Sequence, residues 1–145
     1  MAGSNANRNS VMPEAIDVGL PALKQPFSWM VRANGLLFTA HGPVRADGSI
    51  DTGSVEQQTR LTLDNLQRAV QAAGCTLADV AQVLVYMTDV ADSPAIDAVY
   101  REYFKPPYPN RSSCGVALVV PGMKIEIVAY VAVEKAVPPA QAQGH

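Results

Sequence analysis

Apolar residues recur every three or four positions between residues 54 and 74, which predicts an amphipathic helix. Ser54 and Gln57 have the spacing of a capping box, and Gly74 is the residue type preferred just after a helix C-terminus. The stripe expected to face the core consists of Thr59, Leu63, Leu66, Val70 and Ala73.

A second helix is predicted from residue 93, with Ser93 as its N-cap and Pro94 in its first turn. It runs to Phe104, and Pro106 and Pro107 end it because proline cannot continue a helix.

Short β-branched and alternating runs predict strands on either side of these helices. The predicted strands cover residues 27–33, 36–40, 78–88, 111–120 and 123–134, with a short one near 49–51. Asn34 and Gly35 favour a hairpin turn between the first two. The order is βββ-α-β-α-ββ, an α+β fold with both helices packed on one face of a mixed sheet. Two helices leave the other face uncovered, so association of subunits is expected.

Composition and length fit one folded domain. The chain has 145 residues, of which 48% are apolar. We expect a flexible N-terminal tail at 1–13, a single domain at 14–135 and a flexible C-terminal tail at 136–145, because both ends are polar or rich in small residues.

The charge, the spacing of cysteine and histidine, and the lack of long apolar runs argue against a nucleic-acid-binding protein, a metal site and a membrane protein. The net charge is −2 and the basic residues are scattered, so no nucleic-acid partner is expected. The two cysteines and two histidines show no metal-ligand spacing, and we expect no metal and free, buried thiols. Residues 1–11 hold no apolar signal segment, and no stretch is long enough to span a bilayer. These features predict a cytoplasmic protein without a membrane partner.

Two charged residues near the C-terminus are candidates for chemistry. Arg111 opens a predicted strand, where its planar fork is suited either to binding a carboxylate or to a solvated surface pair. Glu126 lies between Ile125 and Ile127 in an apolar strand. A carboxylate there is either paired in a structural salt bridge or poised as an acid–base group.

Several segments together resemble the Rid/YjgF family of reactive-intermediate deaminases. The most specific are Pro109-x-Arg111-Ser112 and Lys124-Ile125-Glu126-Ile127. The similarity covers about residues 14–134, and its other parts are Ala72-Ala73-Gly74-Cys75 followed by Leu77 through Val83, Val85-Tyr86-Met87-Thr88-Asp89, and Tyr100-x-x-Tyr103-Phe104.

The resemblance implies a chorismate-mutase-like subunit in a trimeric barrel, with active sites between neighbouring subunits. It implies that Arg111 binds the substrate carboxylate and that Glu126 orients or activates a water. Residues implied to line the site are Phe27, Ala40, His41, Ser112 and Ser113. No cofactor is implied, and the partners are a small carboxylate substrate and two further copies of the chain.

The chain departs from the family pattern at three positions. Phe27 stands where many deaminating members have a tyrosine, and His41 stands where they have a glycine. Two interpretations of His41 are open. Its imidazole acts as an acid or base at the cleft, or it is a hydrogen-bonded structural histidine. Ser113 takes the place of a common cysteine, and Cys114 is expected to be a small buried residue and not a nucleophile.

The leading interpretation is an enzyme that hydrolytically deaminates a carboxylate-bearing enamine or imine, either 2-aminoacrylate-like or larger. One alternative is a different hydrolysis or isomerisation of a carboxylate-bearing ring compound in the same cleft, with proton transfer by His41. Another is a non-catalytic ligand-binding or chaperone-like protein. RNA cleavage is disfavoured by the acidic balance. The natural substrate does not follow from the sequence.

Overall fold

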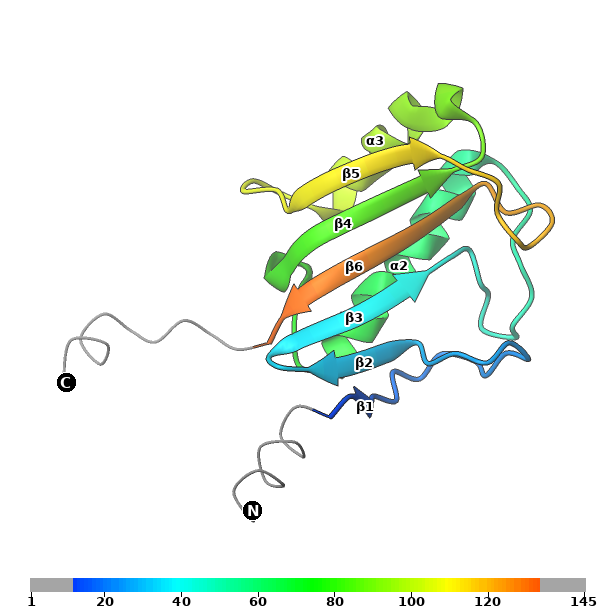
Figure 1. The fold of residues 1–145 in the computed structure, drawn as a ribbon. Helices are drawn as coiled ribbons and strands as arrows, with labels where there is room; N and C mark the ends of the chain where they lie inside the picture. The colour runs from blue at the N-terminus through cyan, green and yellow to red at the C-terminus, as the bar shows by residue number, and fades with distance from the viewer. Residues whose placement is uncertain (1–11, 134–145) are drawn as a thin grey trace, which may run out of the picture.

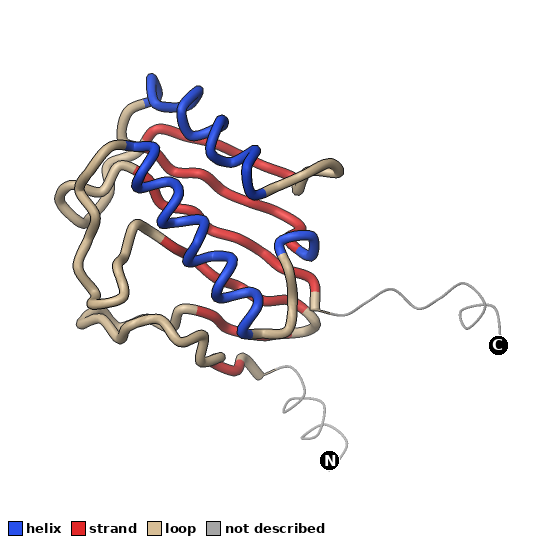
Figure 2. Tube along the Cα trace, turned by 180° about the vertical axis from the view of Figure 1, so that it is seen from behind, coloured by secondary structure: helices blue, strands red, loops and turns tan. Residues whose placement is uncertain are grey.

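A six-stranded mixed sheet carries both helices on one face (Figures 1 and 2). The computed structural model describes residues 12–133. The predicted tails therefore lie outside the described residues, apart from residues 12 and 13. The elements are β1 (Glu14–Ala15), β2 (Met30–Ala33), β3 (Leu36–His41), α2 (Val55–Ala72), β4 (Val80–Met87), α3 (Ser93–Tyr103), β5 (Asn110–Gly115) and β6 (Ile125–Ala132).

The strand order β1-β2-β3-β6-β4-β5 places β5 at one edge of the sheet and β1 at the other. Among the described strands, β4 and β5 are parallel neighbours, and the other neighbours are antiparallel. The prediction of an α+β fold with both helices on one face is confirmed.

Helix α2 has the predicted ends. The Ser54 hydroxyl accepts a hydrogen bond from the Gln57 amide at 3.2 Å, and the Gln57 side chain accepts from the Ser54 amide at 3.1 Å. Gly74 adopts a φ of +83°, which a residue with a side chain rarely adopts. The predicted stripe is buried except for Ala73, which is partly buried.

One predicted strand and the ends of two others are wrong. Residues 49–51 form no strand, only an isolated bridge between Val44 and Ile50, and the additional strand is the two-residue β1. The first predicted strand begins at Met30, not at residue 27, and the strand from Arg111 ends at Gly115.

The N-cap of α3 also differs from the prediction. Ser93 is the first helical residue, and Asp92 occupies the cap position without a side-chain hydrogen bond. A 3₁₀ turn over Val90–Asp92 runs directly into the helix, and Asp89 caps that turn by accepting from the Ala91 amide at 2.9 Å. The capping side chain therefore serves the turn that precedes the helix.

The core fills the space between the helices and one face of the sheet. Leu63 and Leu66 of α2 are fully buried. The sheet positions fully buried in this core are Met30, Leu37, Val83, Val85, Ile125, Ile127, Ala129 and Val131. Because side chains alternate along a strand, the intervening residues project from the opposite face.

That opposite face, here called the open face, has no helix over it among the described residues (Figure 2). Leu36 and Phe38 of β3 remain 36% and 38% exposed. The Phe38 and Tyr130 rings form an edge-to-face pair with centroids 5.6 Å apart. Leu84, Tyr86 and Val128 are partly buried on the same face. An apolar surface of this kind is typical of a contact with another protein chain.

The loop before β6 is fixed to α2 by the buried side chain of Gln58. Its amide nitrogen donates to the carbonyls of Gly53 at 3.2 Å and Gly122 at 2.9 Å, and its carbonyl accepts from the Lys124 amide at 2.8 Å. These bonds set where β6 begins and therefore where Glu126 lies. Neither helix of the described part is long and apolar enough to cross a membrane.

Candidate active site

Arg111 lies on the edge strand β5 and is held on the helix side of the sheet. Its Nη2 donates to Asp97 Oδ1 at 2.6 Å, and its Nε donates to Ser113 Oγ at 3.0 Å. The guanidinium also lies over the Tyr100 ring, 4.7 Å from the centroid. Three contacts therefore hold one guanidinium that is still partly accessible, with 22% of the side chain exposed.

A cavity of about 170 Å³ adjoins this guanidinium. Asp97, Tyr100 and Arg101 of α3 line it, together with Tyr108, Pro109 and Arg111. Two cationic groups and one carboxylate give this cavity a net positive charge, and the tyrosine rings give it apolar walls. A small anion is the ligand class that fits such a site.

Glu126 projects from the open face, because its neighbours Ile125 and Ile127 are fully buried on the helix side. It is half-buried and lies opposite Tyr86 of β4 in the ladder. Desolvation by burial raises the pKa of the Glu126 carboxyl above its ordinary value. The structure shows no ion pair for Glu126 within the described residues, so one chain does not form the salt bridge that was the alternative.

One chain does not bring Arg111 and Glu126 together. Arg111 pairs with Val83, whose side chain is buried on the helix side, and Glu126 projects from the opposite face. Their backbones are separated by two strand spacings across the sheet and by three residues along it. This corresponds to roughly 14 Å.

His41 lies on the helix side of β3, only 1% exposed. Its Nε2 and the Thr39 hydroxyl are 2.7 Å apart, and its ring stacks on Trp29 with centroids 5.6 Å apart and 2° between the planes. Burial lowers the pKa of His41 to about 3, so the ring is neutral near pH 7. This placement favours the interpretation of His41 as a structural histidine.

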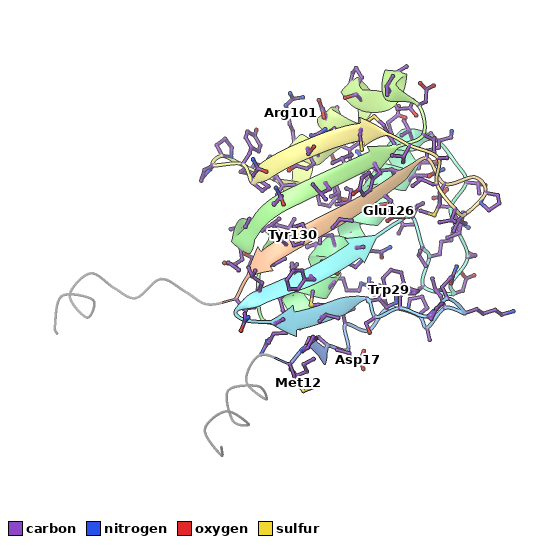
Figure 3. The ribbon with its side chains drawn as sticks, in the orientation of Figure 1. Met12, Asp17, Trp29, Arg101, Glu126 and Tyr130 are labelled. Atoms are coloured by element: carbon purple, nitrogen blue, oxygen red, sulfur yellow. The ribbon has the colours of Figure 1, made fainter. Side chains whose placement is uncertain are left out.

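The other predicted site residues divide into two groups. Phe27 is 47% exposed and packs edge-on against Trp29, and Ala40 lies on the open face diagonally across from Glu126. Ser112 and Ser113 lie on β5 with Arg111. Figure 3 shows Glu126 and Trp29 toward the end of the sheet where β6 and β2 begin, while β5 begins at the opposite end. Phe27 packs on Trp29, whose ring stacks on the helix-side His41, so Phe27 stands apart from Glu126. We call Ala40 and Glu126 the acid half-site, and Arg111, Ser112 and Ser113 the basic half-site.

The prediction that Cys114 is buried is wrong for the single chain, in which its thiol is free and exposed. Its strand β5 is the edge of the sheet, and alternation places Cys114 on the open face. The other thiol, Cys75, is only partly buried.

Sequence reasoning missed the residues around the guanidinium. Asp97 and Tyr100 are three positions apart, so they lie on one side of α3. Tyr100 falls within the second predicted helix and within a family motif, and neither assigns it to the site. The spacing alone gives no sign that this side of α3 faces β5.

Comparison with known proteins identifies the family. The profile described as Endoribonuclease L-PSP matches residues 20–133. The chain belongs to the Rid/YjgF family. Reactive Intermediate Deaminase A, chloroplastic, from Arabidopsis thaliana is 31% identical over 129 residues, which cover 87% of this chain and 69% of the relative.

Two further relatives match most of the chain. A 2-iminobutanoate/2-iminopropanoate deaminase from Capra hircus is 30% identical over 111 residues, covering 75% of this chain and 81% of the relative. The crystal structure of Escherichia coli TdcF with bound serine is 31% identical, with a TM-score of 0.74, covering 82% of this chain and 98% of that chain. Relatives named as deaminases, including one named as an imine deaminase, are therefore similar to this chain, whereas other relatives carry other names.

Proposed function

We propose that this Rid/YjgF protein is an enzyme that hydrolytically deaminates a carboxylate-bearing enamine or imine to a 2-keto acid and ammonia. The observation that carries the proposal is the Arg111 guanidinium, held beside a small cavity with net positive charge at an open sheet edge. The names of deaminases about 30% identical to the chain support the reaction type.

The reaction requires a bound carboxylate and a water held at one carbon. The enamine tautomerises to an imine, water adds to the C=N carbon, and the resulting carbinolamine expels ammonia to leave the keto group. Arg111 binds the substrate carboxylate. Glu126 takes a proton from the attacking water and gives it to the imine nitrogen. It then passes the proton of the carbinolamine hydroxyl to the same nitrogen as ammonia leaves. A carboxyl whose pKa is raised toward neutrality is suited to both steps.

The two half-sites come from different subunits in this proposal. In one chain, opposite faces of the sheet and roughly 14 Å of backbone separate Arg111 from Glu126. A homotrimer built on the open face covers Leu36, Phe38 and Tyr130 and brings the β5 edge of one subunit to the acid half-site of the next. Closed symmetry then gives three equivalent sites.

The test is an ammonia-release assay on imines generated in situ by an amino-acid oxidase. Arg111→Ala and Glu126→Ala are each expected to lower kcat/KM by about a hundredfold or more, because each removes one part of the machinery. Glu102→Ala is the matched control, because Glu102 lies on the same helix as Asp97 and forms an exposed ion pair of 2.7 Å with Arg60 of α2. Equal rates in all four proteins would refute the mechanism.

The alternative reaction on a ring compound relied on proton transfer by His41, and a buried imidazole with a pKa of about 3 does not favour it. The cytoplasmic location stays a prediction, because relatives carry the words chloroplastic or mitochondrial in their names.

A further inference from the structure

We propose that Asp97 is a positioning residue that holds the Arg111 guanidinium with one donor edge directed at the substrate carboxylate. This inference rests on the proposed function, because it assigns the contact by which that reaction recognises its substrate. It assigns a role to a side chain that the sequence pattern did not single out.

The hydrogen bonds divide the guanidinium into an occupied edge and a free edge. Nε–H and one hydrogen of Nη2 point to the same side of the planar group. Ser113 Oγ accepts from the first at 3.0 Å, and Asp97 Oδ1 accepts from the second at 2.6 Å. The other edge carries Nη1 and the second hydrogen of Nη2. Within residues 12–133, Nη1 donates no hydrogen bond.

The free edge matches a carboxylate. Its two parallel N–H groups form the fork that binds both oxygens of one carboxylate. Arg111 and Asp97 line the same cavity. In this proposal the free edge faces the cavity, so that a ligand there meets the fork while Asp97 keeps its own contact. Stacking on the Tyr100 ring fixes the plane of the fork. A guanidinium restrained in this way loses less rotational freedom when the ligand binds.

Helix α3 and strand β5 together hold the Arg111 guanidinium in place. Asp97 and Tyr100 are one helical turn apart on α3, and Arg111 and Ser113 project from the same side of β5. Arg111 is therefore held by two contacts from the helix and one from its own strand. The Asp97 carboxylate also neutralises part of the Arg111 charge. If Asp97 positions the guanidinium, removing the carboxylate weakens substrate binding. If charge attraction alone decides binding, removing it strengthens binding.

The experiment compares Asp97→Ala, Asp97→Asn and the control Glu102→Ala in the ammonia-release assay, as full-length proteins. Asp97→Ala removes the acceptor, and KM is expected to rise about tenfold while kcat changes less than about twofold, because the fork is no longer aimed. Asp97→Asn keeps an oxygen acceptor and is expected to restore KM to within about threefold of the wild type.

Ser113→Ala removes the other contact on the occupied edge and is expected to raise KM by a smaller factor than Asp97→Ala. It changes a side chain on an exposed edge strand, so it tests the inference even if Asp97→Ala does not fold. An unchanged or lower KM in Asp97→Ala would overturn the inference, because Asp97 would then be a bystander or a competitor of the substrate. An unchanged KM in Ser113→Ala would overturn it as well.

Calorimetric binding of pyruvate, a stable 2-keto acid, separates this inference from the proposed reaction. If the wild type binds pyruvate but releases no ammonia from imines, the proposed function fails. The inference about Asp97 is then supported if Asp97→Ala weakens pyruvate binding about tenfold while Asp97→Asn does not. Unchanged pyruvate binding in Asp97→Ala overturns it.

Discussion

Replacing His41 with glutamine is expected to remove an acid-sensitive term from the stability of the protein. His41 is buried and neutral in the folded state, with a pKa of about 3, whereas an unfolded histidine titrates near 6.5. Between these values the unfolded state binds the additional proton, so the wild type loses stability as the pH falls through this window.

The size of the effect follows from the pKa difference. Each pH unit within the window costs the folded state about 1.4 kcal/mol. Relative to pH 7.5, the loss attributable to His41 is therefore about 3 kcal/mol at pH 4.5, and it approaches about 5 kcal/mol near pH 3. Glutamine does not titrate, and its amide is able to keep a hydrogen bond with the Thr39 hydroxyl.

Urea unfolding of both proteins at one protein concentration, at pH 7.5, 6.5, 5.5 and 4.5, measures this term. The free energy of unfolding of the wild type minus that of His41→Gln is expected to fall by about 3 kcal/mol between pH 7.5 and pH 4.5. Parallel curves for the two proteins would refute the reasoning, since His41 would then take up a proton as readily when folded as when unfolded.

Three further changes test the fold, the carboxyl and the assembly. Gln58→Ala removes three hydrogen bonds to the segments around Gly53 and Gly122, and urea unfolding should show a loss of about 2–4 kcal/mol. A loss below about 1 kcal/mol would contradict the role of this side chain as a tether. Glu126→Gln should raise stability at pH 7.5, because it removes a charge that burial disfavours. That gain should disappear as the pH falls below the ordinary carboxyl pKa, and a gain independent of pH would contradict the assignment. Phe38→Asp should lower the mass measured by light scattering while far-UV circular dichroism stays unchanged, because it places a charge on the open face. An unchanged trimer mass, or a wild type that is already a monomer, would contradict the role of this face.

Local signals account for the parts of the fold that the sequence predicted. The capping box at Ser54, the apolar stripe and Gly74 lie within or next to one helix. Their effect therefore depends on local sequence and not on the rest of the chain. The end of β5 depends on a distant partner instead. Its ladder with β4 stops at Gly115 opposite Met87, where β4 itself ends. The sequence between residues 111 and 120 does not predict where β5 ends.

The candidate site shows the same division. The residue types at Arg111 and Glu126 indicated anion binding and acid–base chemistry, but the face of the sheet that each occupies depends on strand register. The ion pair between Arg111 and Asp97 joins an edge strand to a helix, and no periodic pattern connects the two. The expectation of a buried Cys114 failed for a related reason, because strand order makes β5 an edge.

Mixing two inactive variants tests most directly whether the half-sites of neighbouring subunits form one active site. Arg111→Ala and Glu126→Ala subunits are unfolded together, refolded at equal concentrations and assayed for ammonia release. In a cyclic trimer with cross-subunit sites, every mixed trimer holds one intact site, so random mixing should restore about one quarter of wild-type activity. Activity no higher than that of the separate variants, in trimers shown to contain both kinds of subunit, would contradict the account.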